Sequence, residues 1–100
     1  MQIDIRSIHF KADRKLESFI KEKVEKLSQF YDGVIGTEVA LKVANNENSD
    51  NNKVTEIRLN VRGNDLYAKK QSKSFEESTD SAVEALRRQL IKYKDKVRRN

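Results

Sequence analysis

Four stretches of the chain alternate between apolar and polar residues, and two others repeat their apolar residues at helical spacing. The alternating stretches are residues 2–6, 38–44, 54–62 and 66–71. Strict alternation predicts strands that bury one face and expose the other. Apolar residues at intervals of three and four run through 16–30 and 79–97 and predict two amphipathic helices. The order of elements along the chain is therefore strand, helix, three strands, helix.

Capping residues indicate where the two helices begin and end. Asp13 precedes the first helix, where its carboxylate can accept hydrogen bonds from amides two or three residues on. Ser74 and Glu77 form an S-x-x-E capping box before the second helix, which is more than about twenty residues long. Gly33 and Gly36 tolerate positive φ and are expected to end the first helix. The second helix is expected to bury Thr79, Ala82, Val83, Leu86, Leu90, Tyr93 and Val97.

These elements predict an α+β fold of the order β-α-β-β-β-α, with a four-stranded mixed sheet. The first helix connects the first two strands as a crossover, which makes those strands parallel neighbours. Short connections make the last three strands an antiparallel meander, so the predicted sheet order is 1-2-3-4. Because each strand has a single apolar face, both helices are expected on one side of the sheet. The 100 residues contain no repeat or linker, and residues 1–100 are expected to form one domain.

The net charge of +5 comes from the end of the second helix. Residues 1–84 hold 14 basic and 15 acidic side chains, whereas residues 85–100 hold seven basic side chains and one acidic. The seven are Arg87, Arg88, Lys92, Lys94, Lys96, Arg98 and Arg99. They cover the part of the helix surface that its apolar stripe leaves free, and the helix is expected to extend beyond the sheet edge.

Such a cationic helix fits either a solvated surface or a binding surface for a polyanion. Lys23 falls within the apolar stripe of the first helix, where an unpaired ammonium is costly, so it either extends to the rim or belongs to a site. Two helices on one face of the sheet would place Lys23 and Lys26 beside the basic helix in one continuous cationic surface. Few exposed aromatic residues accompany these charges, so the phosphates of double-helical RNA are favoured over stacked single-stranded bases.

The chemistry required for an enzyme or a metal centre is sparse in this sequence. There is no cysteine and one histidine, His9, so no metal site or cofactor is predicted. The three glycines fall at the ends of predicted elements and form no phosphate-binding loop. No apolar run is long enough for a membrane span or a secretion signal, so we expect a cytoplasmic protein. Because the motifs of catalytic sites are missing too, we expect that it is not an enzyme.

Several motifs resemble the bacterial ribosome hibernation promoting factor family over essentially the whole chain. They are Phe19-Ile20 with Lys23, Lys26 and Leu27, then Tyr31-Asp32, Val39-Ala40-Leu41-Lys42-Val43, and Leu86-Arg87-Arg88-Gln89-Leu90-Ile91-Lys92-Tyr93-Lys94-Asp95-Lys96. The resemblance implies a domain similar to double-stranded RNA-binding domains that docks near the decoding centre of the small ribosomal subunit. It also implies a block of messenger and transfer RNA binding, with inhibition of translation in stationary phase or stress. The chain resembles the short form of the family.

The resemblance assigns contacts with ribosomal RNA to particular basic residues. Family positions with this role match Lys23, Lys26, Arg88, Lys92, Lys94, Lys96 and Arg98. Arg87 and Arg99 are additional charges beside them. The expected partner is the small subunit and its RNA, not DNA or a membrane, and the protein is expected to be a monomer off the ribosome. The alternative is a module whose basic helix binds an acidic protein or an anionic membrane surface.

Overall fold

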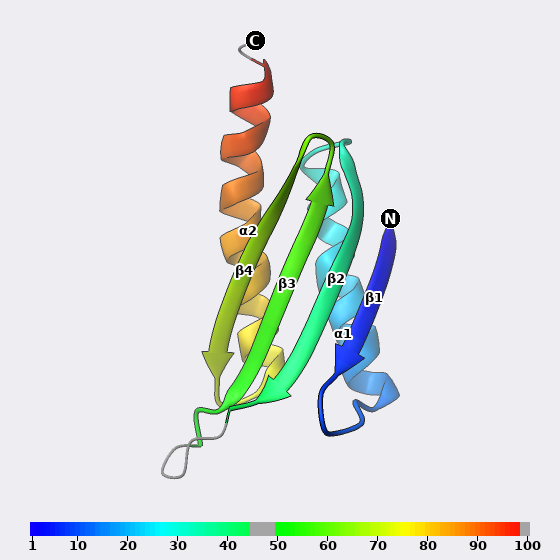
Figure 1. Ribbon diagram of the computed structural model, residues 1–100, viewed down its shortest axis with the longest axis vertical. Coiled ribbons are helices and arrows are strands. Elements are labelled where there is room, and N and C mark those ends of the chain that lie inside the picture. Colours follow the sequence, from blue (N-terminus) through cyan, green and yellow to red (C-terminus); the bar gives the residue numbers. More distant parts are fainter. Residues whose placement is uncertain (45–49, 99–100) are drawn as a thin grey trace.

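The computed structural model describes residues 1–44 and 50–98 and has the predicted element order. Its elements are β1 (Gln2–Ser7), α1 (Arg14–Glu25), the 3₁₀ helix η1 (Lys26–Gln29), β2 (Val34–Val43), β3 (Lys53–Val61), β4 (Asn64–Ser72) and α2 (Phe75–Arg98). The strands form one sheet in the order β1-β2-β3-β4, and both helices lie against the same face of it (Figure 1). The predicted α+β fold is confirmed.

The pairing of the strands also follows the prediction. β1 is parallel to β2, while the β2–β3 and β3–β4 pairs are antiparallel. One row of the sheet runs from Ile5 to Val39, Ile57 and Ala68 across all four strands. Because side chains alternate along a strand, such rows present a continuous apolar surface to the helices.

The hydrophobic core lies between the sheet and the two helices. Its fully buried side chains come from every layer and include Ile20, Val24, Leu27, Leu41, Ile57, Leu59, Leu86 and Leu90. At the start of α2, the rings of Phe10 and Phe75 stack with centroids 5.0 Å apart. Thr55 is also buried, and its hydroxyl lies 2.7 Å from that of Ser78, which satisfies both groups. The helices are therefore fixed to the sheet by apolar burial.

Both predicted N-terminal caps are present. The Asp13 carboxylate accepts a hydrogen bond from the Leu16 amide at 2.8 Å, and Asp13 itself has extended backbone angles. The Ser74 hydroxyl accepts from the Glu77 amide at 3.1 Å. The two helices begin where these caps place them, and Figure 1 shows that they run in the same direction.

The prediction for the end of the first helix was wrong. α1 ends at Glu25 and continues as η1, and β2 begins at Val34, so Gly36 lies inside a strand. Within the described residues only His9 and Gly63 have positive φ. The β2–β3 register shifts between Val34 and Gly36, which breaks the alternation from which strands are recognised. Gly36 instead allows β1 to lie close to β2, since a Cβ at this position would lie 3.2 Å from the Gln2 carbonyl oxygen.

The last turns of α2 extend beyond the β3–β4 hairpin, as expected from the length of the helix (Figure 1). Val97 is 41% exposed there, so its predicted burial was wrong: the sheet beneath it has ended. Val43, at the end of β2, is exposed as well. The Tyr93 hydroxyl donates to the Arg62 carbonyl oxygen at 2.6 Å and ties α2 to the hairpin. The hairpin turns at Gly63, whose φ of 81° suits glycine.

Candidate nucleic-acid interface

The basic residues of α2 form two rows along the helix. Arg88, Lys92 and Lys96 follow one another at intervals of four residues, and all three are exposed. We call them the outer row, because residues four apart lie above one another on one side of a helix. The outer row begins next to Gln89, whose side-chain amide donates to the Tyr67 carbonyl oxygen of β4 at 2.9 Å.

The second row faces α1 and η1 and contains Arg87, Lys94 and Arg98. We call it the groove row. Arg87 lines a groove of about 250 Å³ between α1, η1 and α2, together with Lys23 and Lys26. Lys94 and Arg98 line the next hollow along α2, opposite residues 29–32. The structure therefore brings Lys23 and Lys26 to the groove row, as the sequence predicted. Arg99 lies outside the described residues.

Lys23 reaches the helix interface without being buried as an unpaired charge. Its ammonium lies 3.4 Å from the Asp80 carboxylate of α2 and 5.4 Å from the centre of the Phe19 ring. The side chain remains 33% exposed, so its head group reaches solvent while its stem packs between the helices. The position of Lys23 in the apolar stripe is thus compatible with a charge at the rim of the groove.

Glu84 holds two of the basic residues in place. Its carboxylate accepts from Arg87 at 3.0 Å (Nε) and 2.5 Å (Nη2), and it lies 3.5 Å from Arg88 Nε. Hydrogen bonds from Arg87 hold the pKa of the Glu84 carboxyl below its ordinary value, and the charges of both arginines act in the same direction. Glu84 is therefore ionised at neutral pH and orients the Arg87 guanidinium, while the exposed Arg88 pairs with it more loosely. Together with Asp80 it interrupts the continuous cationic surface that the sequence predicted.

The Glu84 carboxyl is expected to titrate below 4.5, and Arg87→Met should move its pKa back toward that value, since Arg87 supplies the largest effect. A group whose pKa is lower in the folded state than in the unfolded state stabilises the fold at pH values above its unfolded-state pKa. This stabilisation is lost as the pH falls through the folded-state pKa. A carbon-detected NMR titration measures the midpoint directly. Arg88→Met is the matched control and should move it less. An unchanged midpoint in Arg87→Met would contradict the assigned cause.

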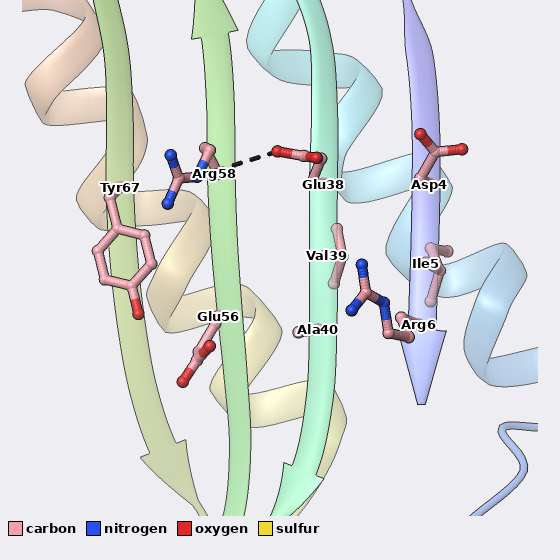
Figure 2. Close-up of a pocket in the computed structure, with 9 residues that line it drawn as sticks. All are labelled: Asp4, Ile5, Arg6, Glu38, Val39, Ala40, Glu56, Arg58 and Tyr67. Atoms are coloured by element: carbon pink, nitrogen blue, oxygen red, sulfur yellow. Dashed lines mark ion pairs between the residues drawn. The ribbon is translucent and has the colours of Figure 1, made fainter. Parts of the chain in front are cut away.

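The opposite face of the sheet is charge-balanced. Figure 2 shows Asp4, Arg6, Glu38, Glu56, Arg58 and Tyr67 around a shallow depression on this face. Most of the charges pair across strands: Arg58 lies 3.9 Å from Glu38 and 3.7 Å from Asp65, and Glu56 lies 2.8 Å from Lys42 and 3.6 Å from Lys69. Opposite charges placed across neighbouring strands stabilise a sheet and leave little field. The basic character of the chain is therefore concentrated on the helical side.

Other kinds of site find little support in the geometry. Among residues 1–44 and 50–98, no three His, Cys, Asp or Glu side chains lie close enough to hold a metal ion. Within the same ranges, no helix has the length and apolarity to cross a membrane. The exposed apolar residues in the last third of α2, Ile91 and Val97, are six positions apart and so lie on different sides of the helix. They provide no apolar stripe for insertion into a lipid surface.

Three residues of the groove were not predicted as part of the site. Glu84 lies three and four residues before Arg87 and Arg88, so its ion pairs could have been found from helical spacing. Asp80 pairs with a residue more than fifty positions away, and Phe30 contacts the Arg87 guanidinium from η1's end. These two contacts depend on how the helices pack, and no local pattern in the sequence indicates them.

Comparison with known proteins shows which family the chain belongs to. Residues 3–98, nearly the whole chain, match the family described as Sigma 54 modulation protein / S30EA ribosomal protein. The chain belongs to this family. Its members include proteins named ribosome hibernation promoting factor, which confirms the resemblance drawn from the sequence motifs. The family consists of ribosome-binding factors and not enzymes, so the prediction of a non-enzymatic protein is also confirmed.

Relatives of the S30EA family match the chain over its full length. The ribosome hibernation promoting factors of Klebsiella oxytoca and Escherichia coli K12 are each 29% identical over 103 residues, covering all of both chains. Two solved structures share the fold. The N-terminal domain of Thermus thermophilus Protein Y has a TM-score of 0.80 at 18% identity, covering 93% of this chain and 99% of that one. A ribosomal subunit interface protein from Coxiella burnetii has a TM-score of 0.83 at 17% identity, with 95% and 99% covered.

Proposed function

We propose that the protein is a ribosome hibernation factor that binds the small ribosomal subunit near the decoding centre. The observation that carries the proposal is the concentration of basic residues on the helical side, in the outer row, the groove row and the groove between the helices. Full-length relatives named ribosome hibernation promoting factor support the choice of the ribosome over other polyanions. The protein then acts where ribosomes are, in the cytoplasm, and reaches them as a monomer.

Inhibition follows from occupancy alone. A folded domain bound through its helices at the decoding centre excludes messenger and transfer RNA by its volume, and no reaction is needed. Lysines supply point charges to phosphates, whereas arginines add a planar fork that binds phosphate oxygens in pairs. The charge-balanced face of the sheet turns away from the RNA, and translation stops in stationary phase or stress for as long as the factor remains bound.

The salt dependence of binding to isolated small subunits tests this proposal. The basic residues of the two rows and the groove would neutralise about six to eight phosphates, so the log–log slope of affinity against salt should be on the order of −4 to −7. Co-sedimentation with small subunits from about 50 to 200 mM salt gives this slope. Large subunits and anionic liposomes serve as controls. Equal binding to liposomes would contradict the proposal and favour the membrane alternative, and a flat salt response would contradict binding through the basic residues.

A further inference from the structure

The groove between α1, η1 and α2 has an apolar floor and a charged rim. Leu27, Phe30 and Val83 line the floor, and Lys23, Lys26 and Arg87 lie among the charged residues around it. Its volume of about 250 Å³ is below the roughly 300–1,000 Å³ of pockets that take whole small molecules. A single planar ring fits such a space better than a complete nucleotide does.

Arg87 is fixed in this groove in a way that its neighbours are not. Its guanidinium lies over the Phe30 ring, 6.0 Å from the ring centre, while Nε and Nη2 donate to Glu84. One edge of the guanidinium is therefore occupied by Glu84, and the Phe30 ring lies nearby. Arg88 is the contrasting case: its side chain is 72% exposed and lies 3.5 Å from Glu84 through Nε. An arginine whose guanidinium is held by a carboxylate beside an aromatic ring can offer the planar group to a nucleobase for stacking.

We infer that the groove receives one unpaired RNA base, which stacks on the Arg87 guanidinium above Phe30. The inference rests on the proposed function, because it takes RNA as the ligand of this surface. Lys26 at the rim, together with Lys23 beside Asp80, would meet the phosphates on either side of that nucleotide. Arg87 then contributes to the choice of binding site, while the other basic residues of the two rows contribute affinity for any phosphate backbone.

The carboxylates of the groove narrow the choice of base. Asp80 and Glu84 line the groove, and their carboxylates are acceptors only; Glu84 already accepts from Arg87, and Asp80 pairs with Lys23. Cytosine, adenine and guanine carry an exocyclic amino group with two N–H donors for such oxygens, whereas uracil offers the single donor N3–H. The groove is therefore expected to favour an unpaired base with an exocyclic amino group over uracil.

Three RNA hairpins of equal stem length test the inference: one fully paired, one with a single bulged cytidine and one with a single bulged uridine. Fluorescence anisotropy with the wild-type protein is expected to show about 5- to 150-fold tighter binding of the bulged cytidine than of the paired stem. The bulged uridine should fall between them. Arg87→Lys keeps the charge and removes the planar group, so the preference for the cytidine bulge should disappear. Arg88→Lys, the matched control, should keep the preference.

The same variants on small subunits separate this inference from the proposed function. Arg87→Lys should bind at least about 5-fold more weakly with an unchanged salt slope, because a stacked base is lost and no phosphate contact is. Circular dichroism melting confirms that both variants are folded. Equal binding of all three hairpins by wild type, or a preference that survives Arg87→Lys, would overturn the inference while the salt-dependent binding of subunits stands. Equal binding of the three hairpins would indicate instead that the groove binds an apolar side chain of a protein partner.

Discussion

Replacing Lys92 and Lys96 with glutamate is expected to weaken binding to small ribosomal subunits on the order of 100-fold at physiological salt. Both side chains are exposed in the outer row, four residues apart, so the double change reverses the charge of one continuous strip. Each lost phosphate contact should also make the salt slope shallower by about 1. Co-sedimentation across salt measures both effects.

The matched control reverses the same number of charges at the other end of the molecule. Lys11 and Lys15 are exposed near the start of α1, far from the overhang of α2 (Figure 1). Lys11→Glu/Lys15→Glu lowers the net charge equally and should leave binding within about 3-fold of wild type, because charges beyond about 8 Å are largely screened in physiological salt. Similar losses in the two double variants would show that net charge and not the outer row determines binding.

Leu90→Ala is expected to lower the free energy of unfolding by about 2–5 kcal/mol. Leu90 is 0% exposed and belongs to the core between the sheet and both helices, so its removal leaves a cavity at the point where α2 leaves the sheet. The total free energy of unfolding of a domain of this size is roughly 5–15 kcal/mol, so the variant should be near the limit of stable folding. Urea denaturation followed by circular dichroism gives the difference.

Ile91→Ala on the next residue of α2 serves as its control. Ile91 is 37% exposed, so the same kind of truncation there removes much less buried surface and should cost under about 1 kcal/mol. Equal losses at the two positions would contradict the assignment of Leu90 to the core and of Ile91 to the surface.

Most of the fold could be predicted from the sequence because its local signals agree with one another. The caps at Asp13 and Ser74 and the alternation of residues 54–62 each indicate the element that the structure contains. The start of β2 could not be predicted in this way. Val34 and Gly36 flank a register shift in which Ile35 is 60% exposed, so the stretch shows neither a strand period nor a helix period.

The basic residues of the candidate site could be predicted from the sequence, whereas its contacts between different helices could not. The wheel of α2 indicates which basic residues share a side, and the spacing of Glu84, Arg87 and Arg88 indicates their ion pairs. The approach of Lys23 to Asp80 depends on the packing of two helices more than fifty residues apart in the chain. Side chains such as Phe30 acquire a role only through that packing, since a half-buried aromatic ring after a helix is usually part of the core.

Tyr93 acts as the pivot of a lever. Its hydroxyl is tied to the Arg62 carbonyl oxygen, and its ring packs edge-on against Tyr31 with centroids 6.0 Å apart. Arg98 lies five residues further, or about 7.5 Å along the axis, so a rotation of about 10° at the pivot moves it by about 1.3 Å and Lys94 by about 0.3 Å. We therefore expect Lys94 to keep its position relative to the sheet and Arg98 to be the more adjustable of the two basic residues.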